Sequence, residues 1–494
     1  MANGEPLKTI ILAACIVISA SCVHAQQSFK VDSADEVESL IESGKLSAGD
    51  TIVWSSGTYK DVELDIEGVN GTKDRPITLR AARPGKVIIR GESQFKVGAQ
   101  HWVIQGFHFT GRNGETNAFN TFQFRSNSGK PAQHVRMTDC AFTNLRTNEE
   151  TSKWVLVYGR FNSIDHCHFS GKNKKGALVT VELGRLEDDE TAEHQFTRNY
   201  FADVAPQKGS DNETIRVGTS HDQNKPARCI VCENYFVGCD GEPEIISNKS
   251  SYNLYERNTF RQCNGALVLR HGQHARVEGN FFFGDGAKNS GGVRVIDSNH
   301  TVVNNYFQDL TGKTWNASLS ILGGDAPPGG TSNGYQRVEN VTIAHNSFFN
   351  CTRSILLNNV KGSGTPTGVI ANNLVASRSE PLVLAELPAE KLKWAGNLMF
   401  GPSRSRDFNA ITSDPRLKKV KGLFRPSPKG PAANSAVEIG TNIEKDIDGQ
   451  TRPKSKADIG ADEVSGATGD RTSGPLKPSD VGVSFLRGNG PNRN

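Results

Sequence analysis

The chain has 494 residues and a formal net charge of only +4, with 36% hydrophobic residues. So small a charge, without a dense run of Lys and Arg interleaved with aromatic residues, argues against a nucleic-acid-binding protein. The 50 glycines and the scarcity of helical periodicity indicate many tight turns rather than a helical protein.

The first 25 residues have the layout of an export signal. A single cation, Lys8, precedes an apolar run over 10–20, and the small residues Val23 and Ala25 precede the expected cleavage site. The run is too short to span a bilayer, and no stretch of about 18 apolar residues follows it. We therefore expect a cleaved signal peptide over 1–25 and a secreted or periplasmic protein without a membrane span. Cys15 offers a lipid-attachment site as an alternative.

Seven cysteines follow the expected cleavage site. An odd number in an oxidising compartment leaves at least one thiol unpaired. Cys229 and Cys232 have the spacing of a zinc or redox pair, but no second pair at ligand spacing occurs. Alternation along a strand would also point these two thiols to opposite faces, so we expect structural thiols. The seven are Cys140, Cys167, Cys229, Cys232, Cys239, Cys263 and Cys351.

A short amphipathic helix is predicted near the start of the mature chain. Ser33 and Glu36 have the spacing of a capping box, and Val37, Leu40 and Ile41 fall on one face of the helix that would follow. An elongated repeat fold needs its open end covered. We interpret this helix as an N-terminal cap.

A three-residue motif, here called the phrase, consists of Asn or Cys, then any residue, then usually Phe. It recurs along the chain with closest spacings of 22 to 27 residues. This is about the length of three short strands and three turns, so each copy predicts one coil of a parallel β-helix. Residues i and i+2 of a strand share a face, so Asn and Phe should both point inward and stack on their equivalents in neighbouring coils. Copies begin at Cys140, Cys167, Asn199, Asn234, Asn258, Asn280, Asn305 and Asn346, with weaker ones at Asn373 and Asn397.

These patterns predict an all-β fold, a right-handed parallel β-helix (solenoid) with an N-terminal capping helix. We expect one β-helix domain over 26–464. Over 465–494 the chain is rich in Gly, Ser, Pro, Asn and Arg and poor in apolar residues, which predicts a disordered tail.

Four polar segments, 211–216, 242–249, 269–272 and 291–294, each follow their own phrase at a similar distance. They should therefore stack as neighbouring strands on one face of the solenoid. Because the interior of a β-helix is filled by its core, function belongs to such outer faces and to the loops. Stacking places Asn212 near Glu242, and Lys249 near Arg270.

Glu242 and Glu244, at i and i+2, should project together, which is costly unless a cation lies between them. Their oxygens and that of Asn212 suit a hard divalent ion. The alternative is a pair of solvated surface acids, but the nearby Lys249 and Arg270 favour a site.

Lys249 could remove a proton if its pKa fell from the usual value of about 10.4. A neighbouring divalent ion and the Arg270 guanidinium would lower it. His271 is either an auxiliary donor or an ordinary structural histidine.

The four segments together resemble polysaccharide lyase family six, which comprises alginate lyases and the dermatan sulfate lyase chondroitinase B. The resemblance extends from about residue 30 to 400. The motifs that carry it are Asn-Glu-Thr-Ile-Arg-Val-Gly at 212–218, Glu-Pro-Glu-Ile-Ile-Ser-Asn-Lys at 242–249, Leu-Arg-His-Gly at 269–272 and Gly-Gly-Val-Arg-Val-Ile at 291–296.

The resemblance implies a calcium-assisted β-elimination with Lys249 as the base and Arg270 as the acid. Glu242, Glu244 and an upstream Asn would hold calcium against the carboxylate of the substrate. Members of the family often carry that Asn two positions earlier, where this chain has Ser210.

The third calcium ligand therefore stays open among Ser210, Asp211 and Asn212, and stacking favours Asn212.

The implied function is that of a secreted lyase acting on alginate, a polymer of mannuronate and guluronate, and leaving C4–C5 unsaturated uronate ends. Alginate is favoured because 291–296 and 336–340 are more similar to the alginate lyases. Arg216 and Arg294, on flanking strands, are expected to bind uronate carboxylates at adjoining subsites.

Three alternatives stay open. One is a dermatan sulfate lyase similar to chondroitinase B. Another is a glycoside hydrolase that would use Glu242 and Glu244 as its two carboxyl groups. The third is a non-catalytic β-helix protein that binds carbohydrate, which would leave the Lys249 and Arg270 pair without a role.

Overall fold

The computed structural model describes residues 25–486, apart from 113, 188, 331–332, 380, 403–407, 442, 465 and 467. The predicted signal peptide, except for its last residue, lies outside the described residues, as do residues 487–494. Within the described part, no helix is long and apolar enough to cross a membrane.

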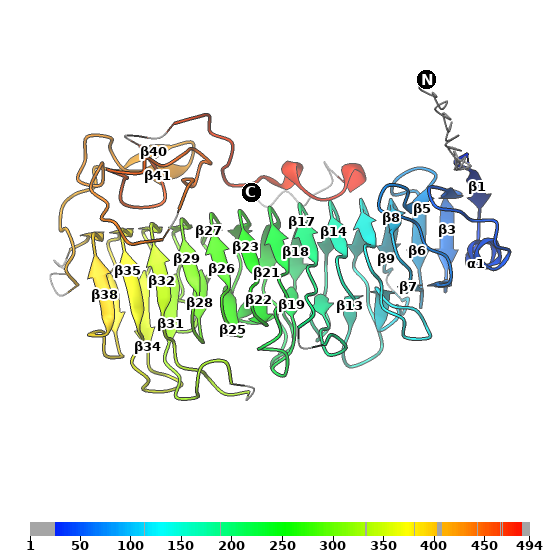
Figure 1. Cartoon of the computed structure of the whole chain (residues 1–494), viewed down its shortest axis with the longest axis horizontal. Helices are drawn as coiled ribbons and strands as arrows, with labels where there is room; N and C mark the ends of the chain where they lie inside the picture. Colours follow the sequence, from blue (N-terminus) through cyan, green and yellow to red (C-terminus); the bar gives the residue numbers. More distant parts are fainter. Residues whose placement is uncertain are drawn as a thin grey trace, which may run out of the picture.

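One α-helix, α1 (Ala34–Glu42), covers the N-terminal end of the structure (Figure 1). The Ser33 hydroxyl caps it by accepting a hydrogen bond from the backbone N–H of Glu36 at 3.2 Å. Val37 is fully buried, and Leu40 and Ile41 pack against the same core. The predicted N-terminal cap is confirmed.

The following strands form three long parallel sheets that wind into a right-handed parallel β-helix, as predicted (Figure 1). Each complete coil gives one strand to each sheet, and the sheets, here called A, B and C, have 14, 13 and 12 strands. Sheet A consists of β1 (Ser28–Val31), β2 (Thr51–Trp54), β5 (Ile77–Ala81), β8 (Trp102–Gln105), β11 (Arg136–Thr138), β14 (Ser163–Asp165), β17 (Gln195–Thr197), β20 (Ile230–Cys232), β23 (Leu254–Glu256), β26 (Arg276–Glu278), β29 (Thr301–Val303), β32 (Val341–Ala344), β35 (Gly368–Ala371) and β38 (Leu392–Ala395).

Sheet B contains the repeated phrase, because the Asn or Cys directly precedes a strand of this sheet and the Phe lies within it. Its strands are β3 (Gly57–Lys60), β6 (Val87–Arg90), β9 (Phe107–Thr110), β12 (Ala141–Thr143), β15 (His168–Ser170), β18 (Tyr200–Val204), β21 (Tyr235–Cys239), β24 (Thr259–Arg261), β27 (Phe281–Phe283), β30 (Tyr306–Gln308), β33 (Ser347–Phe349), β36 (Leu374–Ala376) and β39 (Leu398–Phe400).

The asparagines of the phrase form a continuous ladder. The Nδ2 of Asn234 donates to the Oδ1 of Asn258 at 3.0 Å, and Asn258 donates in the same way to Asn280 at 3.0 Å. Beside this ladder the phenylalanine rings stack, as between Phe260 and Phe282, whose centroids are 4.6 Å apart with an angle of 3° between the rings. The predicted inward stacking is confirmed, and the Asn ladder continues through Asn305, Asn346 and Asn373 to Asn397.

Sheet C carries the four polar segments and therefore positions the candidate site. Its strands are β4 (Glu63–Ile66), β7 (Gln94–Val97), β10 (Asn120–Gln123), β13 (Lys153–Val157), β16 (Val179–Val181), β19 (Ile215–Val217), β22 (Glu244–Lys249), β25 (Ala266–His271), β28 (Val293–Val295), β31 (Leu319–Leu322), β34 (Ile355–Asn358) and β37 (Val383–Ala385).

The β-helix ends with β39, so it is shorter than the domain predicted for 26–464. The chain that follows turns back along the outside of the solenoid, drawn in orange to red in Figure 1. It includes the antiparallel hairpin of β40 (Lys418–Val420) and β41 (Leu423–Arg425). This layer forms a second apolar cluster, in which Leu423, Ile447 and Ile459 pack against outward-facing residues of sheet B such as Phe281.

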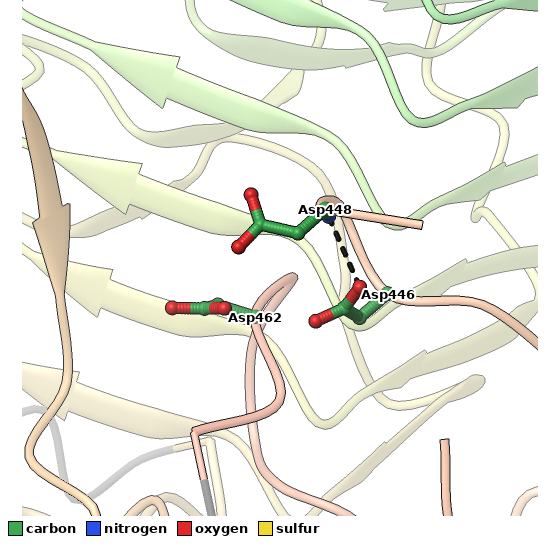
Figure 2. A group of neighbouring side chains, drawn as sticks. All are labelled: Asp446, Asp448 and Asp462. Carbon is green, nitrogen blue, oxygen red and sulfur yellow. Dashed lines mark hydrogen bonds between the residues drawn. The ribbon is translucent and has the colours of Figure 1, made fainter. Parts of the chain in front are cut away.

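Three buried aspartates, Asp446, Asp448 and Asp462, lie together in this C-terminal layer (Figure 2). The Arg425 guanidinium lies between two of them, with Nη1 2.8 Å from Asp448 Oδ2 and 2.7 Å from Asp462 Oδ1. Asp446 accepts the backbone N–H of Asp448 at 3.0 Å, the dashed line in Figure 2. Because Arg425 already supplies a positive charge at the centre, we interpret the cluster as a buried ion-pair network that holds the layer together.

The segment after this layer departs from the predicted disorder. Its described residues up to Leu486 lie along the solenoid and include two short 3-10 helices, η1 (Pro478–Asp480) and η2 (Ser484–Leu486). Val481 and Val483 are buried, so two apolar side chains and a few hydrogen bonds fix a segment whose composition is polar. Those bonds join Leu476 N to Thr259 Oγ1 (2.9 Å), Gly482 N to Arg198 O (2.8 Å) and Ser484 N to Asp139 Oδ1 (2.8 Å).

The seven cysteines from Cys140 to Cys351 are buried and free in the described structure. Cys229 packs in the main core, whereas the Cys232 sulfur lies 3.4 Å from the Arg257 guanidinium. The two thiols thus point to opposite faces, and both behave as structural residues.

Candidate active site

The four polar segments stack as predicted on the outer face of sheet C. Arg216 on β19 is in register with Ser247 on β22, which is in register with Val268 on β25 and through it with Arg294 on β28. The pairing of β22 with β25 is irregular near its end, so that Lys249 lies opposite His271.

Three carboxylates gather beside this row. Glu242 accepts the backbone N–H of Asn212 at 2.7 Å, so the predicted proximity of these two residues is confirmed. Glu244 accepts a hydrogen bond from the Ser247 hydroxyl at 2.6 Å. The third carboxylate is Glu213, which is only 1% exposed and received no role in the sequence analysis.

Burial dominates the electrostatics of these acids. Burial, followed by the like charges of Glu213 and Glu244, raises the pKa of Glu242 to about 8. Burial also raises the pKa of Glu213, and its Oε2 is buried without a hydrogen-bond partner among the described residues. A divalent cation would stabilise such a group of carboxylates and satisfy the free oxygen.

The contacts favour Asn212 as the remaining oxygen ligand. Its Oδ1 accepts one hydrogen bond, from the backbone N–H of Gly176 at 3.1 Å, which leaves a second lone pair. Asp211 is engaged in an ion pair with Arg216. Ser210 contacts Asn212 through its backbone carbonyl, which accepts a hydrogen bond from Asn212 Nδ2 at 3.3 Å.

The two predicted catalytic cations lie at neighbouring positions on β22 and β25. Lys249 Nζ lies 3.3 Å from Glu213 Oε1. Arg270 is held by the long loop between β31 and β32, donating to the carbonyl of Gly334 at 2.9 Å. Its guanidinium carbon also lies 4.2 Å from the centre of the Tyr335 ring. This loop therefore fixes the orientation of Arg270.

His271 is fully buried beside Arg270. Its Nδ1 lies 3.2 Å from Gln336 Oε1. Burial, followed by the positive charge of Arg270, lowers the pKa of His271 to about 4. The imidazole is therefore neutral near pH 7, which fits a residue that supports Arg270 better than a proton donor.

Arg216 and Arg294 do not have the free guanidinium groups expected of substrate-binding residues. Arg216 is 9% exposed and pairs with Asp211 and, at 3.5 Å, with Glu182. Arg294 is 3% exposed, donates to the carbonyl of Trp315 at 2.9 Å and lies 3.6 Å from Glu244. Both face outward from sheet C as alternation predicts, but loops cover them. The carboxylate subsites expected at these positions therefore stay a prediction that their burial does not favour.

A different cation is accessible near Arg270. Lys361, in the loop after β34, is exposed and holds its Nζ 5.2 Å from the Trp315 ring centre and 5.1 Å from that of Tyr335. No ion pair involves Lys361 within the described part of the chain. The sequence did not single it out, because Lys361 lies in a loop and no motif distinguishes it from other surface lysines.

The fold and the site together define a class: a parallel β-helix protein with a carboxylate, lysine and arginine centre on one outer sheet, as in polysaccharide lyases. A family model described as Chondroitinase B matches residues 31–404. The chain therefore belongs to the chondroitinase B family, and the resemblance seen in its sequence is confirmed. A search of curated proteins gives no match.

Solved structures of polysaccharide lyase family six (PL6) are similar to the chain over most of its length. The PL6 alginate lyase AlyGC is 28% identical with a TM-score of 0.78, over 93% of this chain and 58% of that one. The chain thus spans little more than half of AlyGC. A mannuronic acid-specific family 6 lyase from human gut microbiota is 28% identical with a TM-score of 0.67, over 78% of this chain and 89% of that one.

A PL6 alginate lyase in complex with a trisaccharide is 21% identical, with a TM-score of 0.64, over 82% of this chain and 92% of that one. At this identity the likeness supports the fold alone.

Proposed function

We propose that the protein is a secreted, calcium-assisted lyase that cleaves alginate by β-elimination and leaves C4–C5 unsaturated uronate ends. The observation that carries the proposal is the group of three carboxylates beside Lys249, with Arg270 on the neighbouring strand β25. A hydrolase using Glu242 and Glu244 as its two carboxyl groups would give no role to this pair of cations.

The carboxylates fit calcium. Glu242, Glu244 and Asn212 offer oxygen ligands, and the buried carboxylate of Glu213, whose Oε2 has no hydrogen-bond partner among the described residues, adds a fourth. When bound, calcium would neutralise the substrate carboxylate and make the C5 proton more acidic.

The protein's own groups would then perform the proton transfers. Lys249, in its neutral amine form after its own proton has passed to solvent, removes the C5 proton, the electron pair forms the C4–C5 double bond, and the C4–O bond breaks. The leaving oxygen takes a proton from Arg270 or from water. Because an arginine keeps its proton in proteins, its main contribution is to stabilise negative charge, with His271 packed beside it.

For a carboxylate of an adjoining sugar, we propose Lys361 in place of Arg216 and Arg294. Its ammonium group is exposed, free of ion pairs in the described structure and held over two aromatic rings close to Arg270.

Alginate is the first substrate to test, because AlyGC is described as an alginate lyase and the gut-microbiota lyase as mannuronic acid-specific. The family name keeps dermatan sulfate as the alternative. Alginate, polymannuronate, polyguluronate and dermatan sulfate should each be incubated with the protein and calcium, following the ultraviolet absorbance of unsaturated uronate. Cleavage of dermatan sulfate alone would change the substrate, and saturated products would favour a hydrolase. Binding without any cleavage would return the non-catalytic alternative to first place.

A further inference from the structure

A cationic pocket lies on the outer face of sheet C, well away from Lys249. It is a cavity of about 290 Å³, near the lower end of the usual range of ligand pockets. Lys96, Arg125 and Arg185 line it, and its lining residues include no carboxylate. A pocket of this size and charge suits one anionic group of a larger ligand.

The two arginines are fixed in place but keep free donors. Arg125 donates through Nε to Gln123 Oε1 at 3.2 Å and lies with its guanidinium carbon 4.1 Å from the Tyr158 ring centre. Arg185 donates through Nη1 to the carbonyl of Gly129 at 2.7 Å. Since a guanidinium has five N–H donors, each arginine retains several for a ligand.

The nearest acids do not cancel these two charges. Two acids border the pocket on the side of Lys96. Asp65 is in register with Lys96 and accepts the Asn127 backbone N–H at 3.0 Å. Glu67 accepts a hydrogen bond from the Ser128 hydroxyl at 2.7 Å and interacts with Lys130. These acids offset the charge of Lys96, so the lysine contributes less. Glu182, the acid near Tyr158, is already paired with Lys153 at 3.8 Å and with Arg216 at 3.5 Å. Arg125 and Arg185 therefore supply the unbalanced positive charge.

The register of sheet C places the pocket in line with the candidate active site. Gln123 and Ser247 occupy equivalent outward positions, and Arg125 and Lys249 each lie two residues further along, on the same outward side. The ladder continues past Gln123, because Phe124 N donates to Leu156 O at 2.9 Å. The linking pairs are Gln123 with Leu156, Leu156 with Thr180, Thr180 with Arg216, and Arg216 with Ser247.

The distance between the two positions matches a stretch of polymer. The order β10–β13–β16–β19–β22 gives four steps between neighbouring strands, or roughly 19 Å at about 4.8 Å a step. These strands follow one another along the solenoid axis (Figure 1). One sugar of an extended 1,4-linked uronate chain is about as long as one step, so the pocket lies about four sugars from Lys249.

We propose that Arg125 and Arg185 form a distal subsite that binds a carboxylate of the same uronate chain, about four sugars from the cleaved bond. The inference rests on the proposed function and extends it. Arginine binds carboxylates through paired, charge-assisted hydrogen bonds, which gives such a subsite both affinity and orientation. Long chains gain this contact, whereas a trisaccharide bound at Lys249 is too short to reach it.

Binding tests the subsite without requiring turnover. In a Lys249→Ala background, the double variant Arg125→Ala with Arg185→Ala should bind long alginate chains about tenfold more weakly, as expected for one lost charge-assisted contact. The trisaccharide should bind with the same affinity in both. Arg83→Ala, at an exposed arginine that follows β5 in sheet A, is the matched control and should bind like the background.

Kinetics provide the second arm. With Lys249 intact, the double variant should lower the ratio of kcat/KM on the long polymer to kcat/KM on the trisaccharide by about tenfold. Equal losses on both lengths, or an unchanged affinity for the polymer, would reject the distal subsite. If the double variant does not fold, the single change Arg185→Glu, at an exposed residue, should produce the same length-dependent loss.

The outcomes separate this inference from the proposed function. If the wild-type protein cleaves no uronate polymer, the proposed function fails, while the binding assay still reports on the pocket. If the wild type cleaves the polymer but the arginine variants bind it normally, the distal subsite alone fails.

Discussion

Lys249 and Glu213 form an ion pair at the base of the candidate site, with 3.3 Å between Nζ and Oε1. The Glu213 side chain is almost completely buried, whereas that of Lys249 remains 18% exposed. The buried acid thus holds a lysine whose tip can reach a substrate on the outer face of sheet C. The negative charge of Glu244 contributes to the raised pKa values of both Glu213 and Glu242. This pairing makes the roles of Lys249 and Glu213 separable by mutation.

Lys249→Ala should remove nearly all turnover while leaving the fold intact. A positioned base typically contributes about 10²–10⁴-fold to the rate. The loss of the Lys249 ammonium also leaves the buried Glu213 without its ion-pair partner, so the variant should fold but melt at a lower temperature than the wild type. The rate of formation of unsaturated product and the melting temperature should be measured together. Lys393→Ala, at an exposed lysine of β38, is the control and should retain full activity. Activity of Lys249→Ala within a few-fold of the wild type would show that another group is the base.

Glu213→Gln should weaken calcium binding by about tenfold or more. The change removes one of three neighbouring negative charges but keeps the size of the side chain and its polar oxygen. Calorimetric titration with calcium, with magnesium as a comparison, measures the effect independently of turnover. Glu390→Gln, at an exposed acid before β38, serves as the control. If calcium affinity stays constant while turnover falls, Glu213 serves Lys249 and not the metal.

Lys361→Ala should weaken substrate binding, whereas Arg294→Ala should lower stability. Loss of the exposed Lys361 ammonium should raise KM roughly fivefold, as for about 1 kcal/mol from one exposed charge contact, at an unchanged melting temperature. Loss of Arg294 should leave Glu244 unpaired and destabilise the protein by about 3–5 kcal/mol, as for a broken buried ion pair. Steady-state kinetics and urea unfolding of both variants provide the comparison. A raised KM with normal stability for Arg294→Ala would restore that residue as a subsite.

The sequence was sufficient to predict the parts of the structure that depend on repetition. Asn258 and Phe260 recur at coil spacing, so their inward stacking follows from strand alternation alone, and the same regularity brought Asn212 next to Glu242. The burial of Arg294 could not be predicted in this way. It depends on Trp315 and Asn316, which come from the loop between β30 and β31, and loop paths carry no period.

Glu213 shows a second limit of alternation. It lies just before β19 begins, where the two-residue period of a strand no longer determines the direction of a side chain. The sequence pattern therefore does not predict its burial. The C-terminal layer was missed for a related reason, because its contacts with sheet B depend on outward-facing apolar residues such as Phe281 rather than on a repeat.

Buried neutral histidines should make the protein sensitive to acid. Burial lowers the pKa of His194 to about 3 and that of His300 to about 4, and the Nδ1 of each accepts a backbone N–H, from Asn162 and Ala275 respectively. In the unfolded chain both would titrate near about 6.5. As the pH falls below that value, the unfolded state binds protons that the folded state does not, so stability present at pH 7 is lost towards pH 4.

Urea unfolding measures this loss as a fall in the urea concentration at the midpoint. Test conditions of about pH 7.0, 5.5 and 4.5 span the window set by these pKa values. His300→Gln should unfold more easily at pH 7, because the buried contacts with Ala275 and Ile296 are disturbed. It should nevertheless lose less stability on acidification, because one titrating group is gone. His221→Gln, at an exposed histidine, should keep the wild-type pH dependence. If the urea midpoint of His300→Gln falls with pH as steeply as that of the wild type, the acid sensitivity comes from the carboxylates instead. Their charged forms hold ion pairs such as that between Arg452 and Glu463.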